Sequence, residues 1–103
     1  YSHRQTLTGH TNSVETLTAL SATTFASGSY DKTIRVWALD PQSQTYTHRQ
    51  TLTGHTDYVC TLTTLSATTF ASGSSDNTIK IWQTNLKPTL EELEEKAPEC
   101  KMM

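Results

Sequence analysis

Residues 27–37 read SGSYDKTIRVW, and residues 72–82 read SGSSDNTIKIW. When residues 1–37 are aligned with residues 46–82, the offset is 45 residues and 28 of the 37 positions are identical. Shared composition does not produce a match of this length. The chain therefore contains an internal repeat, and the period of a repeat is its most informative property.

Each copy begins with a Gly-His pair, Gly9-His10 or Gly54-His55, and ends on a tryptophan, Trp37 or Trp82. A period of 45 residues with these two landmarks resembles the WD40 repeat, the four-stranded blade of a β-propeller. The Trp-Asp dipeptide that usually ends the repeat reads Trp37-Ala38 and Trp82-Gln83 here, a departure at a position that varies freely in that family. The resemblance covers residues 1 to about 84 and implies an all-β fold.

The resemblance implies two four-stranded antiparallel WD40-type blades, an incomplete propeller, followed by a short C-terminal helical tail. The alternation of apolar and polar residues, bounded by turn-forming residues, predicts the strands of each blade. The expected strands are 14–20, 25–29, 33–39 and 48–53 in the first copy, and 59–65, 70–74 and 78–84 in the second. The expected units are an outer strand at 1–8 that completes a neighbouring or terminal blade, blade 1 at 9–53, blade 2 at 54–86 without its outer strand, and an acidic tail at 87–103.

Two blades leave apolar faces uncovered, because each blade buries both of its faces against neighbours and propellers close with four or more blades. The chain begins with a spare strand at residues 3–8, and the second blade lacks one after Trp82. Two interpretations follow. Either three or four copies join head to tail into a ring of six or eight blades, or the chain is a segment of a longer array.

The tail differs from the repeats in charge and in pattern. Residues 88–103 contain two Lys and five Glu, a balance of −3. Thr89 and Glu92 form a capping box that predicts a short helix at about 90–97. One alternative is a solvated, half-formed helix. The other is that Leu90 and Leu93 dock across the open blade.

Composition excludes several classes of function. The net charge is −2 and the chain shows no basic cluster, so we expect no nucleic-acid partner. No apolar run approaches the ~20 residues that span a bilayer, and no signal-peptide pattern opens the chain, so we expect no membrane partner. Cys60 and Cys100 do not form a disulfide framework, which favours a reducing compartment, the cytoplasm or the nucleus.

The resemblance also implies a structural network in each blade, in which the indole N–H binds the Ser hydroxyl, the hydroxyl binds the imidazole, and the imidazole binds the Asp. The residues of the two networks are His10, Ser27, Asp31 and Trp37, and His55, Ser72, Asp76 and Trp82. A catalytic Ser-His-Asp set is the alternative, but duplication and the absence of an expected cleft argue against it. The four histidines have no metal-ligand spacing, so we expect no metal and no cofactor.

The loop before the first strand of each copy and the turn after the second strand lie at one end of the predicted sheet. We call this end the rim: residues 9–15 and 29–32, with their copies 54–60 and 74–77. Five of the nine positions that differ between the copies lie there. In the WD40 family this rim docks peptides and proteins. The resemblance makes Ser13, Glu15, Tyr30, Tyr58, Cys60 and Ser75 the candidate partner-binding residues.

The sequence therefore predicts a non-catalytic scaffold that binds a protein or peptide partner through the rim. Two alternatives remain open. The two-blade unit could exist to assemble into a ring, as a homo-oligomer or with further WD40 blades. It could also be a regulatory repeat segment of a larger enzyme.

Overall fold

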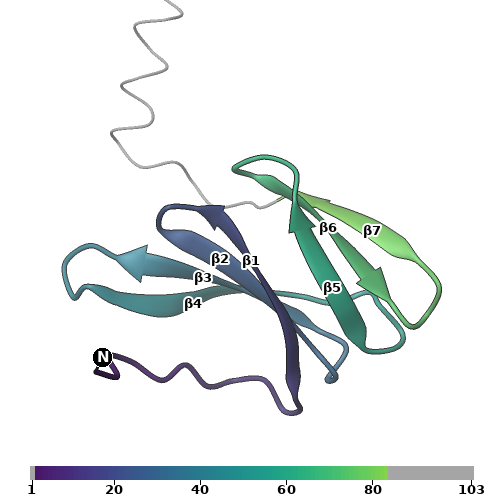
Figure 1. Cartoon of the computed structure of the whole chain (residues 1–103), viewed down its shortest axis with the longest axis horizontal. Coiled ribbons are helices and arrows are strands. Elements are labelled where there is room, and N and C mark those ends of the chain that lie inside the picture. Colours follow the sequence, from purple (N-terminus) through teal and green to yellow (C-terminus); the bar gives the residue numbers. More distant parts are fainter. Residues whose placement is uncertain (1, 84–103) are drawn as a thin grey trace, which may run out of the picture.

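The computed structural model describes residues 2–83, and within that range the chain forms seven β-strands. Four of them form one antiparallel sheet in the order β1-β2-β3-β4, and three form a second sheet in the order β5-β6-β7 (Figure 1). The strands are β1 (Val14–Ser21), β2 (Thr24–Ser29), β3 (Ile34–Asp40), β4 (Thr45–Leu52), β5 (Val59–Thr64), β6 (Thr69–Ser74) and β7 (Ile79–Gln83). We call the first sheet blade 1 and the second blade 2.

The two blades repeat the same register, including one of its irregularities. Leu17 lies opposite Ser27 in blade 1, and Leu62 lies opposite Ser72 in blade 2. The ladder shifts between Val14 and Thr16, and again at the equivalent place in β5. A shift of this kind bends the strand and increases its twist. The 45-residue repeat of the sequence is thus a repeat of backbone geometry.

The strands found differ from the predicted ones by a few residues at their ends. The largest difference is in β4, which begins at Thr45 and not at His48. Gln44 has a φ of 58° and its N–H donates to the carbonyl of Asp40 at 2.8 Å, so a tight turn closes the hairpin and pairing starts at once. The third strands begin at Ile34 and Ile79, since the preceding threonines belong to turns.

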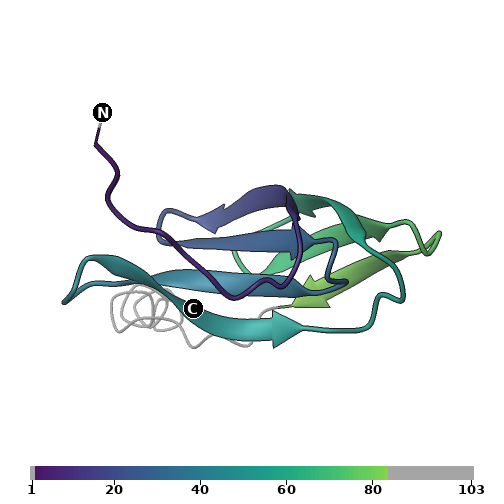
Figure 2. The same cartoon turned by 90° about the horizontal axis from the view of Figure 1, so that it is seen from below.

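The hydrophobic core lies between the blades, which stack face to face (Figure 2). Its buried members are Leu20, Ala26, Ile34 and Val36 from blade 1, and Val59, Leu62 and Phe70 from blade 2. Val59 packs on Gly28, where an added Cβ would lie 2.7 Å from Val59 Cγ1. The glycine in the Ser-Gly-Ser motif therefore lets the two sheets approach closely.

The segment before β1 forms no strand within residues 2–13. The side chain of Gln5 instead binds the edge of β4: its Nε2 donates to the Tyr46 carbonyl at 2.8 Å, and its Oε1 accepts from the Tyr46 N–H at 2.8 Å. A β-strand is stabilised by backbone hydrogen bonds to a neighbouring strand. Here the side-chain amide of Gln5 occupies the backbone N–H and carbonyl of Tyr46, which a neighbouring strand would otherwise bind. That residues 1–8 complete a neighbouring blade stays a prediction.

The helix predicted at about 90–97, and with it the docking of Leu90 and Leu93, lies outside the described residues. Among residues 2–83 the structure contains no helix long and apolar enough to cross a membrane.

Candidate functional site

Four side chains in blade 1 form a continuous hydrogen-bonded chain from the centre of the blade to its rim. Trp37 Nε1 donates to Ser27 Oγ at 2.9 Å, and Ser27 Oγ lies 2.7 Å from His10 Nε2. His10 Nδ1 lies 2.8 Å from Asp31 Oδ2. An indole can only donate and a carboxylate can only accept, so the direction of every hydrogen bond is fixed. Trp37 donates to Ser27, Ser27 donates to Nε2 of His10, and Nδ1 of His10 donates to Asp31.

Blade 2 contains the same chain. Trp82 Nε1 donates to Ser72 Oγ at 2.7 Å, and Ser72 Oγ lies 2.7 Å from His55 Nε2. His55 Nδ1 lies 2.9 Å from Asp76 Oδ2. All eight residues that the resemblance assigned to the networks are therefore brought together, four in each blade.

The aspartate at the end of each chain is held in its ionised form. Desolvation by partial burial opposes ionisation of Asp31, but hydrogen bonds from the Thr33 hydroxyl, from His10 and from backbone N–H groups outweigh it and lower the pKa of Asp31 well below its ordinary value. In blade 2 the hydrogen bond from Thr78 leads, and the pKa of Asp76 is lowered in the same way. These bonds favour the charged carboxylate, since each of them is made to its oxygens.

The order Ser-His-Asp is that of a nucleophilic triad, but the environment of the serine differs from that of a nucleophile. Ser27 is 3% exposed and Ser72 is 1% exposed, and each hydroxyl oxygen accepts an indole N–H. A substrate carbonyl has no access to these oxygens. The arrangement links the second and third strands of a blade to the loop before its first strand. In residues 2–83 no three His, Cys, Asp or Glu side chains cluster closely enough to hold a metal ion.

The rim carries the six candidate partner-binding residues, and the structure brings two of them into direct contact across the blades. The rings of Tyr30 and Tyr58 stack with centroids 4.0 Å apart and planes inclined by 12°. The hydrogen bond with Tyr58 raises the pKa of Tyr30, and the negative charge of Glu15 also raises it. The sequence placed both tyrosines among the candidate partner-binding residues but predicted no contact between them.

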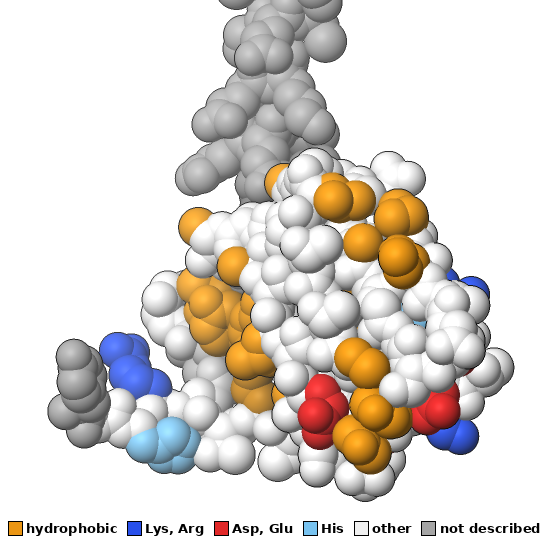
Figure 3. All heavy atoms as spheres, turned by 45° about the vertical axis from the view of Figure 1, so that its right-hand side comes forward, with side chains coloured by type: hydrophobic (Ala, Val, Ile, Leu, Met, Phe, Trp, Pro, Cys, Tyr) orange, Lys and Arg blue, Asp and Glu red, His pale blue; other side chains and the backbone are white. Residues whose placement is uncertain are grey.

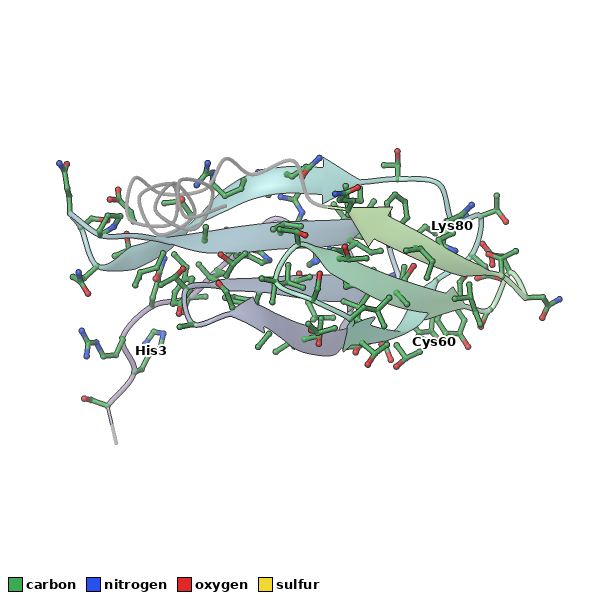
Figure 4. All side chains as sticks on the ribbon, turned by 90° about the horizontal axis from the view of Figure 1, so that it is seen from above. His3, Cys60 and Lys80 are labelled. Carbon is green, nitrogen blue, oxygen red and sulfur yellow. The ribbon has the colours of Figure 1, made fainter. Side chains whose placement is uncertain are left out.

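The remaining candidates lie around this pair. The Tyr30 N–H donates to the Ser13 carbonyl at 2.9 Å in blade 1. In blade 2 the Ser75 N–H donates to the Tyr58 carbonyl at 3.2 Å, and Cys60 Sγ lies 3.5 Å from Ser75 Oγ. Cys60 is exposed on β5, as Figure 4 shows. These backbone bonds tie the loop before the first strand to the turn after the second, so the rim has a defined shape.

A concave region lies away from the rim, and no motif in the sequence indicated it. It is an open groove of about 610 Å³ between the N-terminal segment and blade 1. Its lining consists of Arg4, Gln5, Leu7, Phe25, Ser43, Gln44, Thr45 and Tyr46. Because three of these residues belong to a segment without strand pairing, its shape depends on where that segment lies.

Twisted antiparallel sheets that stack face to face and each carry a Trp-Ser-His-Asp chain define a repeat protein of the β-propeller class. The family model described as "WD domain, G-beta repeat" matches residues 1–38 and 46–83. The chain belongs to the WD40 family. Members of this family are generally non-catalytic scaffolds that bind protein partners.

Two solved structures illustrate the relationship. The structure of U3-55K is 31% identical with a TM-score of 0.68, and the match covers 80% of this chain and 24% of that one. The WD40 β-propeller domain of Doa1 is 23% identical with a TM-score of 0.35, and the match covers 75% of this chain and 40% of that one. This chain thus spans less than half the length of either. No curated protein matches it.

Proposed function

We propose that this chain is a non-catalytic scaffold that binds a protein or peptide partner through its rim, anchored by Tyr30 and Tyr58. The observation that carries the proposal is the stacked pair itself. Tyr30 is exposed and Tyr58 half-buried, so the pair offers aromatic surface at the point where the two blades meet. Rigid aromatic side chains with a polar tip contribute large contact area at low entropic cost.

The neighbourhood of the pair indicates the chemistry of the partner. Glu15 lies close enough to Tyr30 to affect its ionisation, and Glu15 is itself exposed. A cation over an aromatic face is attracted by the ring quadrupole, and a nearby carboxylate adds a direct charge interaction. We therefore expect the partner to place a Lys or Arg side chain against Tyr30.

A peptide display experiment with the full chain as bait tests this function. We expect the selected peptides to be enriched in Lys or Arg next to an apolar residue. The double variant Tyr30→Ser with Tyr58→Ser introduces the residue that each position has in the other blade. Its Kd for the selected peptides rises at least about tenfold, which corresponds to about 1.4 kcal/mol.

The matched control is Arg49→Ala, an exposed substitution on β4 outside the rim, which leaves the Kd unchanged. If the double variant binds the selected peptides as tightly as the wild type, or if Arg49→Ala weakens binding to the same extent, the partner docks elsewhere and the proposed rim function is wrong.

A further inference from the structure

The exposed hydrophobic side chains of this chain are not scattered. Six large hydrophobic residues are exposed in the described part, and five of them are the 45-residue copies of side chains buried between the blades. The exposed five are Val14, Leu17, Leu65, Ile79 and Ile81, and their buried copies are Val59, Leu62, Leu20, Ile34 and Val36. Val59 is 0% exposed and Leu62 7%, whereas Val14 is 52% exposed and Leu17 63%.

The exposed residues form two separate faces that complement each other. Val14 and Leu17 lie on β1, on the side of blade 1 that faces away from blade 2. Ile79 and Ile81 lie on β7 opposite Gly73 and Ala71 of β6, on the side of blade 2 that faces away from blade 1. Figure 3 turns the β7 side forward and shows hydrophobic side chains gathered in patches there. The face with Val14 and Leu17 repeats the half of the internal interface that blade 2 supplies. The face with Ile79 and Ile81 repeats the half that blade 1 supplies.

We propose that the open face of blade 2 binds the β1 face of a second copy of this chain, head to tail. Val14 of the second copy then packs on Gly73 as Val59 packs on Gly28, and Leu17 takes the place of Leu62. The buried hydrophobic residues that meet are the same as in the internal interface, except that Ile81 replaces Val36, a difference of one methylene group.

The same docking supplies a fourth strand to blade 2, which has three within residues 2–83. In blade 1, β4 pairs with β3 so that Val36 lies opposite Gln50 and Trp37 opposite His48. Shifting this register by 45 residues places Gln5 opposite Ile81 and His3 opposite Trp82. This pairing is not formed within the single chain, where His3 lies on the opposite side of the molecule from Lys80 of β7 (Figure 4). A second copy brings residues 2–8 to β7 and covers its open edge.

Two contacts of the internal interface are not repeated between copies. The Tyr30–Tyr58 stack becomes a Ser75–Ser13 pair, because those are the equivalent residues. The hydrogen bond between Thr18 Oγ1 and Thr64 Oγ1, at 2.9 Å, is lost because Ala19 occupies the position of Thr64. We therefore expect the contact between copies to be weaker than the contact between the two blades, and to depend on protein concentration.

Sedimentation of the 103-residue chain at several concentrations tests the proposal. We expect the wild type to associate, and Leu17→Asp or Ile79→Asp each to prevent the chain from growing past a monomer. Both side chains are largely exposed in the single chain, so each variant keeps the wild-type circular dichroism and tryptophan fluorescence. Because each variant retains the other face, an equimolar mixture forms a 1:1 dimer and no larger species, as a head-to-tail contact requires.

A disulfide trap tests the strand pairing. In a chain with Cys60→Ser and Cys100→Ser, Thr6→Cys with Lys80→Cys forms dimers and larger species linked by disulfides. The matched control is Arg35→Cys with Thr51→Cys, the equivalent pair in β3 and β4, where the residues lie opposite each other and the link forms within one chain. Ser13→Tyr with Ser75→Tyr copies the tyrosine stack into the contact between copies and lowers the concentration needed for association.

A wild-type chain that stays monomeric at every concentration overturns the proposal, and so does association that Ile79→Asp leaves unchanged. Growth of the mixture beyond a dimer, or Thr6–Lys80 links formed only within one chain, also contradicts it. Leu17 and Ile79 lie outside the rim, so a variant that stays monomeric can still bind peptide there, and the two proposals fail separately.

Discussion

The ring of Tyr30 stacks on the ring of Tyr58 across the seam between the two blades, 4.0 Å from centroid to centroid. The two residues stand at non-equivalent positions of the repeat, since their copies are Ser75 and Ser13. Divergence of the two repeats at the rim thus created a contact that neither repeat contains. The tyrosines hold the blades together at the same surface where we propose that a partner binds.

The first prediction concerns the energy of this contact. In a double-mutant cycle with Tyr30→Ser and Tyr58→Ser, we expect a coupling of about 0.5–1.5 kcal/mol, the range for stacked aromatic pairs. Urea unfolding followed by tryptophan fluorescence measures it, because Trp37 and Trp82 report on the two blades separately in single-Trp backgrounds. Purely additive losses in the two single variants would show that the stack does not stabilise the seam.

A second prediction concerns the buried hydrogen-bonded chain of blade 1. Trp37→Ala removes a side chain that is 5% exposed and lowers the free energy of unfolding by about 3–5 kcal/mol. Trp37→Phe keeps most of the packing, loses the N–H to Ser27, and costs less, because a single hydrogen bond contributes about 1 kcal/mol. Thermal or urea unfolding orders the two variants. A Phe variant as unstable as the Ala variant would assign the energy to the hydrogen bond rather than to packing.

The third prediction is a dependence of stability on pH. The folded pKa values of Asp31 and Asp76 lie below the ordinary value of about 3.9. The unfolded state therefore binds protons first as pH falls, so the stabilisation from these groups is complete above about pH 5 and is lost progressively below pH 4. Asp31→Asn lowers stability at pH 7 and flattens the acid limb of the curve. Urea unfolding midpoints between pH 2 and pH 7 measure both effects, and an unchanged acid limb would contradict the assignment.

The fourth prediction compares the two equivalent glycines. A Cβ at Gly28 would lie 2.7 Å from Val59 Cγ1 and 2.9 Å from Thr16 Cγ2, whereas a Cβ at Gly73 would meet Thr61 Cγ2 at 3.0 Å. We expect Gly28→Ala to cost about 1–3 kcal/mol, the range for overpacked cores, and to cost more than Gly73→Ala. Unfolding of the monomer at low concentration measures the difference. Equal losses would mean that the seam relaxes around the added methyl group.

The candidate site was partly predictable. The resemblance to the WD40 repeat implied both Trp-Ser-His-Asp chains, and the spacing from His10 to Trp37 recurs from His55 to Trp82. It also placed the six rim residues on one end of the sheets. The Tyr30–Tyr58 contact was not predictable. The two tyrosines belong to different repeats and occupy non-equivalent positions, which no pattern within one repeat relates. Nor was the binding of Gln5 to Tyr46, which depends on a strand edge that is open in the single chain.

By itself the sequence determined the repeat and, through its resemblance to the WD40 repeat, the antiparallel blade and its internal hydrogen bonds, since those depend on residue types at fixed spacing: alternation, turn residues and one indole donor per repeat. Only the tertiary structure decided which of two identical residues, one in each repeat, is buried. Val14 and Val59 occupy the same place in the same motif, yet one is 52% exposed and the other 0%. The reason is physical: hydrophobic burial requires an opposing surface, and blade 1 covers β5 while nothing in residues 2–83 covers the Val14 and Leu17 face to the same extent.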